Sequence, residues 1–120
     1  MAIERFEDIR AWQQARELTN AIYQISSEAD FAKDFRFRDQ IRAAAVSIMA
    51  NIAEGFDSGS DPEFLRFLNY ARRSATEVQS HLYVALDQQY ISQEQFQFLY
   101  DLTTTTRKLI SGLMRYLRHS

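Results

Sequence analysis

Few side chains in this sequence have the type and spacing that catalysis or metal binding requires. Glu77 and His81 are four residues apart, whereas the carboxylate-bridged metal pairs of helical bundles use a Glu-x-x-His spacing. The other histidine, His119, lies in the C-terminal tail, and the chain has no cysteine, no Gly-x-Ser-x-Gly motif and no glycine-rich phosphate loop. We therefore expect no catalytic residue, no metal site, no cofactor and no enzymatic activity.

A line of polar residues along the segment 36–57 is a candidate polar network. Ser47 and Asn51 are one helical turn apart and share a face. If the next helix folds back about residue 59, Arg42 lies beside Glu77, and Ser47 lies beside Arg72. Buried polar groups must satisfy one another and can fix the register of a helix pair; ligand recognition is the alternative use. The candidates are Gln40, Arg42, Ser47, Asn51, Glu54, Ser74 and Glu77.

Basic residues gather in two pairs, Arg72 with Arg73 and Arg107 with Lys108. Antiparallel packing of the last two helices would bring the pairs level and predicts a local basic belt. The candidate nucleic-acid contacts are therefore Arg72, Arg73, Arg107 and Lys108. A solvated face is the alternative, because the helix dipole favours cations near a helix C-terminus.

The elements that must position these groups are helices, because the chain has only three glycines and one proline in 120 residues. All-β domains need many more turn residues. Hydrophobic residues make up 46% and charged residues 25%, the balance of a globular protein, and the length suits one domain over residues 1–120. The net charge of −2 supplies no overall attraction to nucleic acid.

Periodic apolar residues separated by short breaks predict four helices. Their expected ranges are about 7–27, 36–57, 61–88 and 92–118. Pro62 suits a first helical turn with Ser60 or Asp61 as its cap, and a capping-box pattern begins at Ser92. Short connections make neighbouring helices antiparallel. The predicted fold is an all-α, up-down-up-down four-helix bundle.

The third predicted helix carries a heptad seam, which indicates bundle packing. Its members are Phe64, Leu68, Ala71, Ala75, Val78, Leu82 and Ala85, and the fourth helix continues the spacing with Leu99, Thr103, Thr106, Ile110, Leu113 and Leu117. The four threonines at 103–106 oppose helix propensity, so we expect the two on the seam, Thr103 and Thr106, to pack their methyls and bond their hydroxyls to the preceding turn. Residues 28–36 break the pattern and are predicted to form a loop that is partly tucked against the end of the bundle.

Apolar residues exceed one stripe per helix, which indicates a surface that another molecule covers. Alanines occur all around the second predicted helix, and apolar side chains lie off the seam of the third. These residues are Ala43, Ala44, Ala45, Ala50, Ala53, Leu65, Phe67, Tyr83 and Leu86. We therefore expect a homo-oligomer; the alternative is that the side aromatics only cover loop ends.

The chain has no sequence signal for a membrane or for export. The N-terminal string MAIERFEDIR is charged and lacks the apolar core of a signal peptide. No apolar run approaches the roughly 20 residues that span a bilayer. We expect a cytoplasmic protein with no membrane partner.

Four strings between residues 6 and 77 follow one another in the order found in one family, and the third of them is fairly specific when it occurs together with the first. They are Phe6–Gln13 (FEDIRAWQ), Gln40–Ala44 (QIRAA), Ser47–Gly55 (SIMANIAEG) and Ala71–Glu77 (ARRSATE). With them the sequence resembles a bacterial four-helix-bundle family that includes proteins encoded by intervening sequences inside large-subunit ribosomal RNA genes. The resemblance implies a homopentameric ring.

The same family is similar to the accessory variability determinants of diversity-generating retroelements, which bind a reverse transcriptase and nucleic acid. This chain, with its net charge of −2, departs from their basic character. We expect a non-enzymatic, self-associating bundle that acts as a scaffold or interaction module. The alternative is a nucleic-acid-binding accessory protein that contacts RNA or DNA through the local belt. A protein partner is not identified by the sequence.

Overall fold

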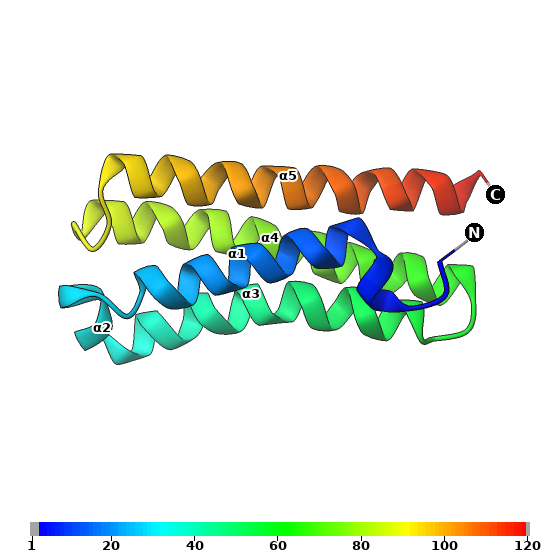
Figure 1. The fold of residues 1–120 in the computed structure, drawn as a ribbon, viewed down its shortest axis with the longest axis horizontal. Helices are drawn as coiled ribbons and strands as arrows, with labels where there is room; N and C mark the ends of the chain where they lie inside the picture. Colours follow the sequence, from blue (N-terminus) through cyan, green and yellow to red (C-terminus); the bar gives the residue numbers. More distant parts are fainter. Residues whose placement is uncertain (1–2, 120) are drawn as a thin grey trace.

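Four long helices lie side by side in the computed structural model, which describes residues 3–119 (Figure 1). They are α1 (Arg10–Ile25), α3 (Phe35–Phe56), α4 (Asp61–Asp87) and α5 (Gln93–Arg118). A 3-10 turn, η1 (Phe6–Asp8), precedes them, and the short helix α2 (Ala29–Lys33) lies between α1 and α3. The described residues contain no strand. The predicted all-α helical bundle is therefore confirmed.

Each long helix packs against two of the others. The main contacts join α1 to α3, α3 to α4, α4 to α5 and α5 back to α1, so α3 and α5 occupy opposite corners of the bundle. In Figure 1 the chain runs leftward along α1, returns along α3 and repeats this course along α4 and α5. The two ends of the chain therefore lie at the same end of the bundle.

The helix starts follow the capping signals of the sequence. Ser60 caps α4 by accepting a hydrogen bond from the Glu63 backbone N–H at 3.3 Å, with Pro62 in the first turn. Ser92 and Gln95 form the complete capping box at the start of α5. Each cap satisfies backbone donors that the first helical turn leaves without an intrahelical partner.

Two predicted boundaries are wrong. Residues 28–36 are not simply a loop, because they contain α2, whose Phe31 is buried and stacks on Phe37 and Tyr90 with ring centroids 5.6 and 5.3 Å apart. The first helix begins at Arg10 and not at residue 7, because η1 precedes it and Ile9 is extended. The need to bury Phe31 at the bundle end explains the extra helix.

The predicted seams are buried in the core, except that one position of the α5 seam differs from the prediction. All seven seam residues of α4 are buried, and Thr103 and Thr106 donate their hydroxyls to the backbone carbonyls one turn earlier at 2.7 and 2.8 Å. The hydroxyl bonds expected for Thr103 and Thr106 are therefore confirmed. In the last part of α5, Met114 is buried where Leu113 was predicted, and Leu113 is half-buried.

The two helical glycines should respond oppositely to alanine. A Cβ at Gly55 would lie 2.7 Å from Phe67 Cβ and 3.0 Å from Phe64 Cδ1, whereas at Gly112 it would meet only Arg115 Nη2 at 3.8 Å. We expect Gly55→Ala to destabilise the fold by about 1–3 kcal/mol through overpacking, and Gly112→Ala to stabilise it by about 1 kcal/mol through helix propensity. Urea unfolding at low protein concentration measures both; shifts of the same sign would contradict the packing assigned to Gly55.

Tyr90 should make the fold sensitive to alkali. Its hydroxyl donates to Asp34 Oδ2 at 2.8 Å, and Asp34 Oδ1 caps α3 by accepting from the Phe37 N–H at 3.2 Å. The hydrogen bond to Asp34, followed by desolvation, raises the pKa of Tyr90. A raised folded-state pKa gives stability that is complete below the ordinary tyrosine pKa of about 10 and is lost as the pH rises through the folded value. The stability difference between wild type and Tyr90→Phe should therefore shrink above that pH; a constant difference would refute this.

Candidate functional site

A polar hollow of about 520 Å³ lies on the outer side of the contact between α3 and α4. Ser47 Oγ and Ser74 Oγ are 3.0 Å apart, and Asn51 Nδ2 donates to the Ser47 hydroxyl and carbonyl at 3.1 and 2.9 Å. These three half-buried side chains therefore join α3 to α4. The residues that line the hollow are Ser47, Asn51, Tyr70, Arg73, Ser74 and Glu77.

The expected pair of Arg42 and Glu77 does not form. Arg42 Nε donates to Ser26 Oγ at 2.8 Å, its Nη2 donates to Ser27 Oγ at 3.0 Å, and its guanidinium lies 4.6 Å over the Tyr23 ring. Arg42 thus binds the C-terminal end of α1. Five residues separate it from Ser47, roughly 1.4 helical turns, so the two side chains lie on opposite flanks of α3.

The remaining members of the predicted network are dispersed. Glu77 contacts His81, with Oε2 and Nε2 3.1 Å apart, on its own helix. Gln40 and Glu54 are exposed, and neither has a hydrogen bond or ion pair within residues 3–119. Ser47 does not meet Arg72, because the Arg72 Nη2 donates to Asn69 one turn earlier on α4.

A second hollow, of about 380 Å³, follows α5. Arg107 Nη1 donates to Gln79 Oε1 at 3.1 Å, and Gln79 Nε2 donates to Thr104 Oγ1 at 3.0 Å. Gln79 is only 5% exposed, and the sequence analysis did not single it out, although it directly follows the seam residue Val78. The lining residues are Thr104, Arg107, Lys108, Ser111 and Arg115.

The predicted basic belt is divided between two places. Arg73 lines the hollow between α3 and α4, whereas Arg107 and Lys108 line the hollow on α5. Arg72 is engaged with Asn69. Positions 72 and 73 are adjacent in sequence and therefore point about 100° apart around α4, so two residues at the same height along the bundle need not share a face.

Two apolar edges remain exposed on opposite helices. On α3, Ala43, Val46 and Ala50 are exposed, whereas Ala44 and Ala45 are buried against the core. On α5, a second heptad-spaced stripe lies beside the buried one, and it escaped the sequence analysis. Its members are Phe98, Leu102, Thr105, Leu109, Gly112 and Tyr116. Of the four residues predicted off the α4 seam, Tyr83 is exposed and Leu65, Phe67 and Leu86 are half-buried; Tyr70 and Val84 of the same helix are also exposed.

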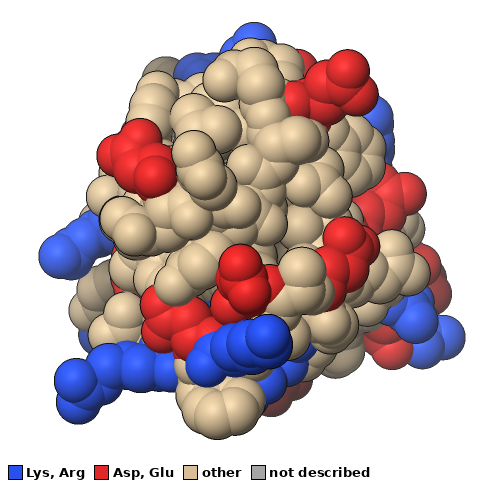
Figure 2. Space-filling model, turned by 90° about the vertical axis from the view of Figure 1, so that its left-hand side faces the viewer, with Lys and Arg blue, Asp and Glu red and all other residues tan. Residues whose placement is uncertain are grey.

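The bundle end that holds α2 carries both signs of charge. Figure 2 shows Lys and Arg next to Asp and Glu in its lower part, with uncharged residues over much of the rest. Neither the basic nor the acidic side chains form a continuous patch on this end of the bundle. This end therefore offers no concentrated positive potential for a phosphate backbone.

Residues 3–119 contain no group of three or more His, Cys, Asp or Glu side chains that could hold a metal ion. No helix among them is long and apolar enough to cross a membrane. A third hollow, of about 350 Å³ and lined by Phe6, Ala53, Glu54 and Asp57, has no cation among its lining residues. The features with the stronger case for binding are therefore the other two hollows and the two apolar edges.

The fold and these surfaces define a small all-α bundle protein with polar and basic surface hollows. The chain matches the 23S rRNA-intervening sequence protein family over residues 7–112 and belongs to that family. It is also similar to a solved structure from Bacteroides thetaiotaomicron, a protein of unknown function from the S23 ribosomal protein family, with a TM-score of 0.80 and 24% identity over 88% of this chain and 95% of that one. No curated protein matches significantly.

The role of Arg42 can be tested by removing its charge. Arg42→Met keeps the aliphatic stem but loses the charged hydrogen bonds to α1, so we expect a cost of about 2 kcal/mol in unfolding free energy. Arg36→Met is the matched control, because Arg36 is exposed on the same helix and has no hydrogen bond or ion pair in the described chain; it should change stability by less than about 0.5 kcal/mol. Equal effects in chemical denaturation would argue against the helix-joining role.

Proposed function

We propose that this protein is a non-enzymatic, self-associating bundle of the cytoplasm whose copies form a homopentameric ring that serves as a scaffold or interaction module. The observation that carries the proposal is the pair of apolar edges on α3 and α5. The up-down-up-down bundle is the unit of the ring, and its edges are the contacts between copies. The number five rests on the family resemblance.

The edge on α5 has the spacing of a helix-packing seam. Its residues follow one another by four and three positions, the pattern that packs knobs into the holes of a facing helix. Phe98 and Tyr116, at the two ends of the stripe, are 53% and 50% exposed. Because the chain itself leaves such large apolar side chains uncovered, the stripe suits a partner helix.

The edge on α3 offers a surface of complementary size. Its exposed residues Ala43, Val46 and Ala50 are small and leave room for the larger side chains of α5. The two helices occupy opposite corners of the bundle, so one copy can use its α3 edge and its α5 edge at the same time. A contact between two different patches is heterologous, and repeated rotation closes such contacts into a ring.

The two edges also lie at the same height along the long axis of the bundle. The hydrogen bonds that join α3 to α4 and α4 to α5 fix how far each helix is shifted along its neighbour. Counting from these contacts along oppositely directed helices places Ala50 level with about Gly112. In a ring whose axis follows the bundles these two small residues face each other, which permits a close helix approach.

Association itself is the first test. Light scattering coupled to size-exclusion chromatography should give the mass of a pentamer at micromolar concentration. Phe98→Glu on α5 and Ala50→Glu on α3 should each yield monomers with unchanged helical circular dichroism, because each buries a charge in the interface. Tyr83→Glu, at an aromatic side chain of α4 that is 52% exposed and off both edges, should remain pentameric. A wild-type protein that is monomeric at this concentration would contradict the proposal.

A mixing experiment tests the head-to-tail arrangement. Phe98→Glu leaves the α3 edge intact, and Ala50→Glu leaves the α5 edge intact. An equimolar mixture of these two monomers should therefore form a heterodimer through the remaining pair of edges, whereas neither variant alone should dimerise. If the α5 edge instead packed against itself, Ala50→Glu alone would still associate and the mixture would give no new species.

The alternative, a nucleic-acid-binding accessory protein that uses Arg72, Arg73, Arg107 and Lys108, has narrower support. These four cations lie in separate surroundings. Contact with RNA or DNA through a continuous belt would need them on one face. The α5 hollow is the basic feature that favours binding of an anion.

A further inference from the structure

The hollow on α5 concentrates positive charge in a chain that is acidic overall. Three of its five lining residues are the cations Arg107, Lys108 and Arg115, and the other two are the hydroxyl residues Thr104 and Ser111. No carboxylate lines it, although the whole chain has a net charge of −2. Its volume of about 380 Å³ falls in the range of sites for small ligands.

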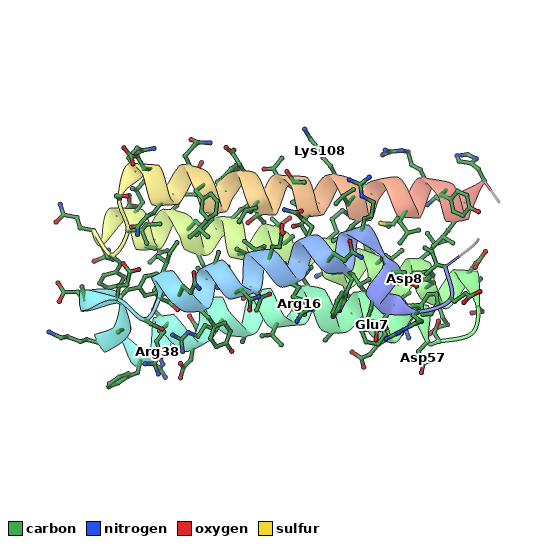
Figure 3. All side chains as sticks on the ribbon, in the orientation of Figure 1. Glu7, Asp8, Arg16, Arg38, Asp57 and Lys108 are labelled. Carbon is green, nitrogen blue, oxygen red and sulfur yellow. The ribbon has the colours of Figure 1, made fainter. Side chains whose placement is uncertain are left out.

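The cations of the hollow are not neutralised by the protein. The ion pairs of the described residues are formed by Arg5, Lys33, Arg38, Arg66 and His81, so Arg107, Lys108 and Arg115 have no carboxylate partner within residues 3–119. Lys108 projects from the outer side of α5, away from the other helices (Figure 3). Three like charges within about two helical turns repel one another, and a bound anion would relieve that repulsion.

Arg107 is held in place yet incompletely bonded. The buried Gln79 accepts from its Nη1 at 3.1 Å and is itself held by Thr104. In the described chain, Gln79 is the sole hydrogen-bond partner of this guanidinium, so Nη2 has no protein acceptor. Nε is buried without a partner, which is costly for a polar donor. The internal contacts of Arg107 thus fix the orientation of its guanidinium but leave some of its N–H donors without an acceptor.

We infer that this hollow binds a phosphate group. A guanidinium whose position is fixed presents a planar set of donors that matches phosphate, a lysine adds a mobile point charge, and neighbouring hydroxyls donate to the remaining oxygens. Arg107, Lys108 and Arg115 supply the charge, and Thr104 and Ser111 supply the hydroxyls. The phosphate is carried either by a small molecule or by a nucleic-acid backbone.

The phosphate site is separate from the proposed assembly edge. The α5 stripe contains Leu102, Leu109 and Gly112, whereas the hollow contains Thr104, Lys108 and Ser111. At about 100° per residue the two sets point to different sides of α5. The site therefore goes beyond self-association and does not depend on it.

Titration calorimetry of the full chain at low ionic strength tests the inference with two probes, pyrophosphate and a single-stranded RNA oligonucleotide. Wild type should bind at least one of them at one site per chain. The double variant Lys108→Gln/Arg115→Gln should weaken binding at least roughly tenfold, since each charge-assisted contact to phosphate is strong. Both residues are exposed, so the fold should be unchanged by circular dichroism.

The matched control is Arg10→Gln/Arg36→Gln, which removes two exposed arginines from α1 and α3 and changes the net charge equally. It should keep the wild-type affinity. If pyrophosphate binds and the double variant weakens that binding, the phosphate belongs to a small molecule. If RNA binds in a way that depends on Lys108 and Arg115 while pyrophosphate does not bind, the phosphate belongs to a nucleic acid. Binding of neither probe, or equal weakening in test and control variants, would overturn the inference.

Discussion

The buried seam of α4 is the contact on which the rest of this molecule depends. Its seven residues, which run from Phe64 to Ala85 by steps of four and three, are all buried between α3 on one side and α5 on the other. Small residues at Ala71 and Ala75 allow close approach, and larger ones fill the space between helices. The positions of α3 and α5 relative to each other follow from this one seam.

Polar contacts beside the seam then set the register of the neighbouring helices. The pair Ser47 and Ser74 joins α3 to α4, and Gln79 joins α4 to α5 through Thr104 and Arg107. Such half-buried groups are costly when unpaired, so a shift by one turn would leave several without partners. Arg42 has the same effect between α3 and α1. These contacts decide which surface groups lie level and therefore what the outside of the bundle presents.

The surface divides into parts that suit different kinds of partner by their chemistry. The exposed small residues of α3 and the exposed stripe of α5 lie at opposite corners, as a head-to-tail assembly requires. The hollow with Arg107, Lys108 and Arg115 lies on another side of α5 and collects charge without opposing carboxylates. One helix thus contributes an inner seam to the core, a second stripe to the proposed assembly edge and a third set of residues to the proposed phosphate site.

Local pattern alone determined the helices, most of their caps and the buried seams, because helical periodicity and capping depend on residues a few positions apart. The Ser60 and Ser92 caps and the threonine bonds of α5 are examples. Which side chains pair between two helices depends on the direction in which each side chain points relative to the neighbouring helices. Tertiary packing sets that direction. For that reason Arg42 turned out to bind α1 and not Glu77, and Phe31 formed a helix where a loop was expected. The hollow on α5 and its anchor Gln79 likewise emerged only once α4 and α5 were packed together.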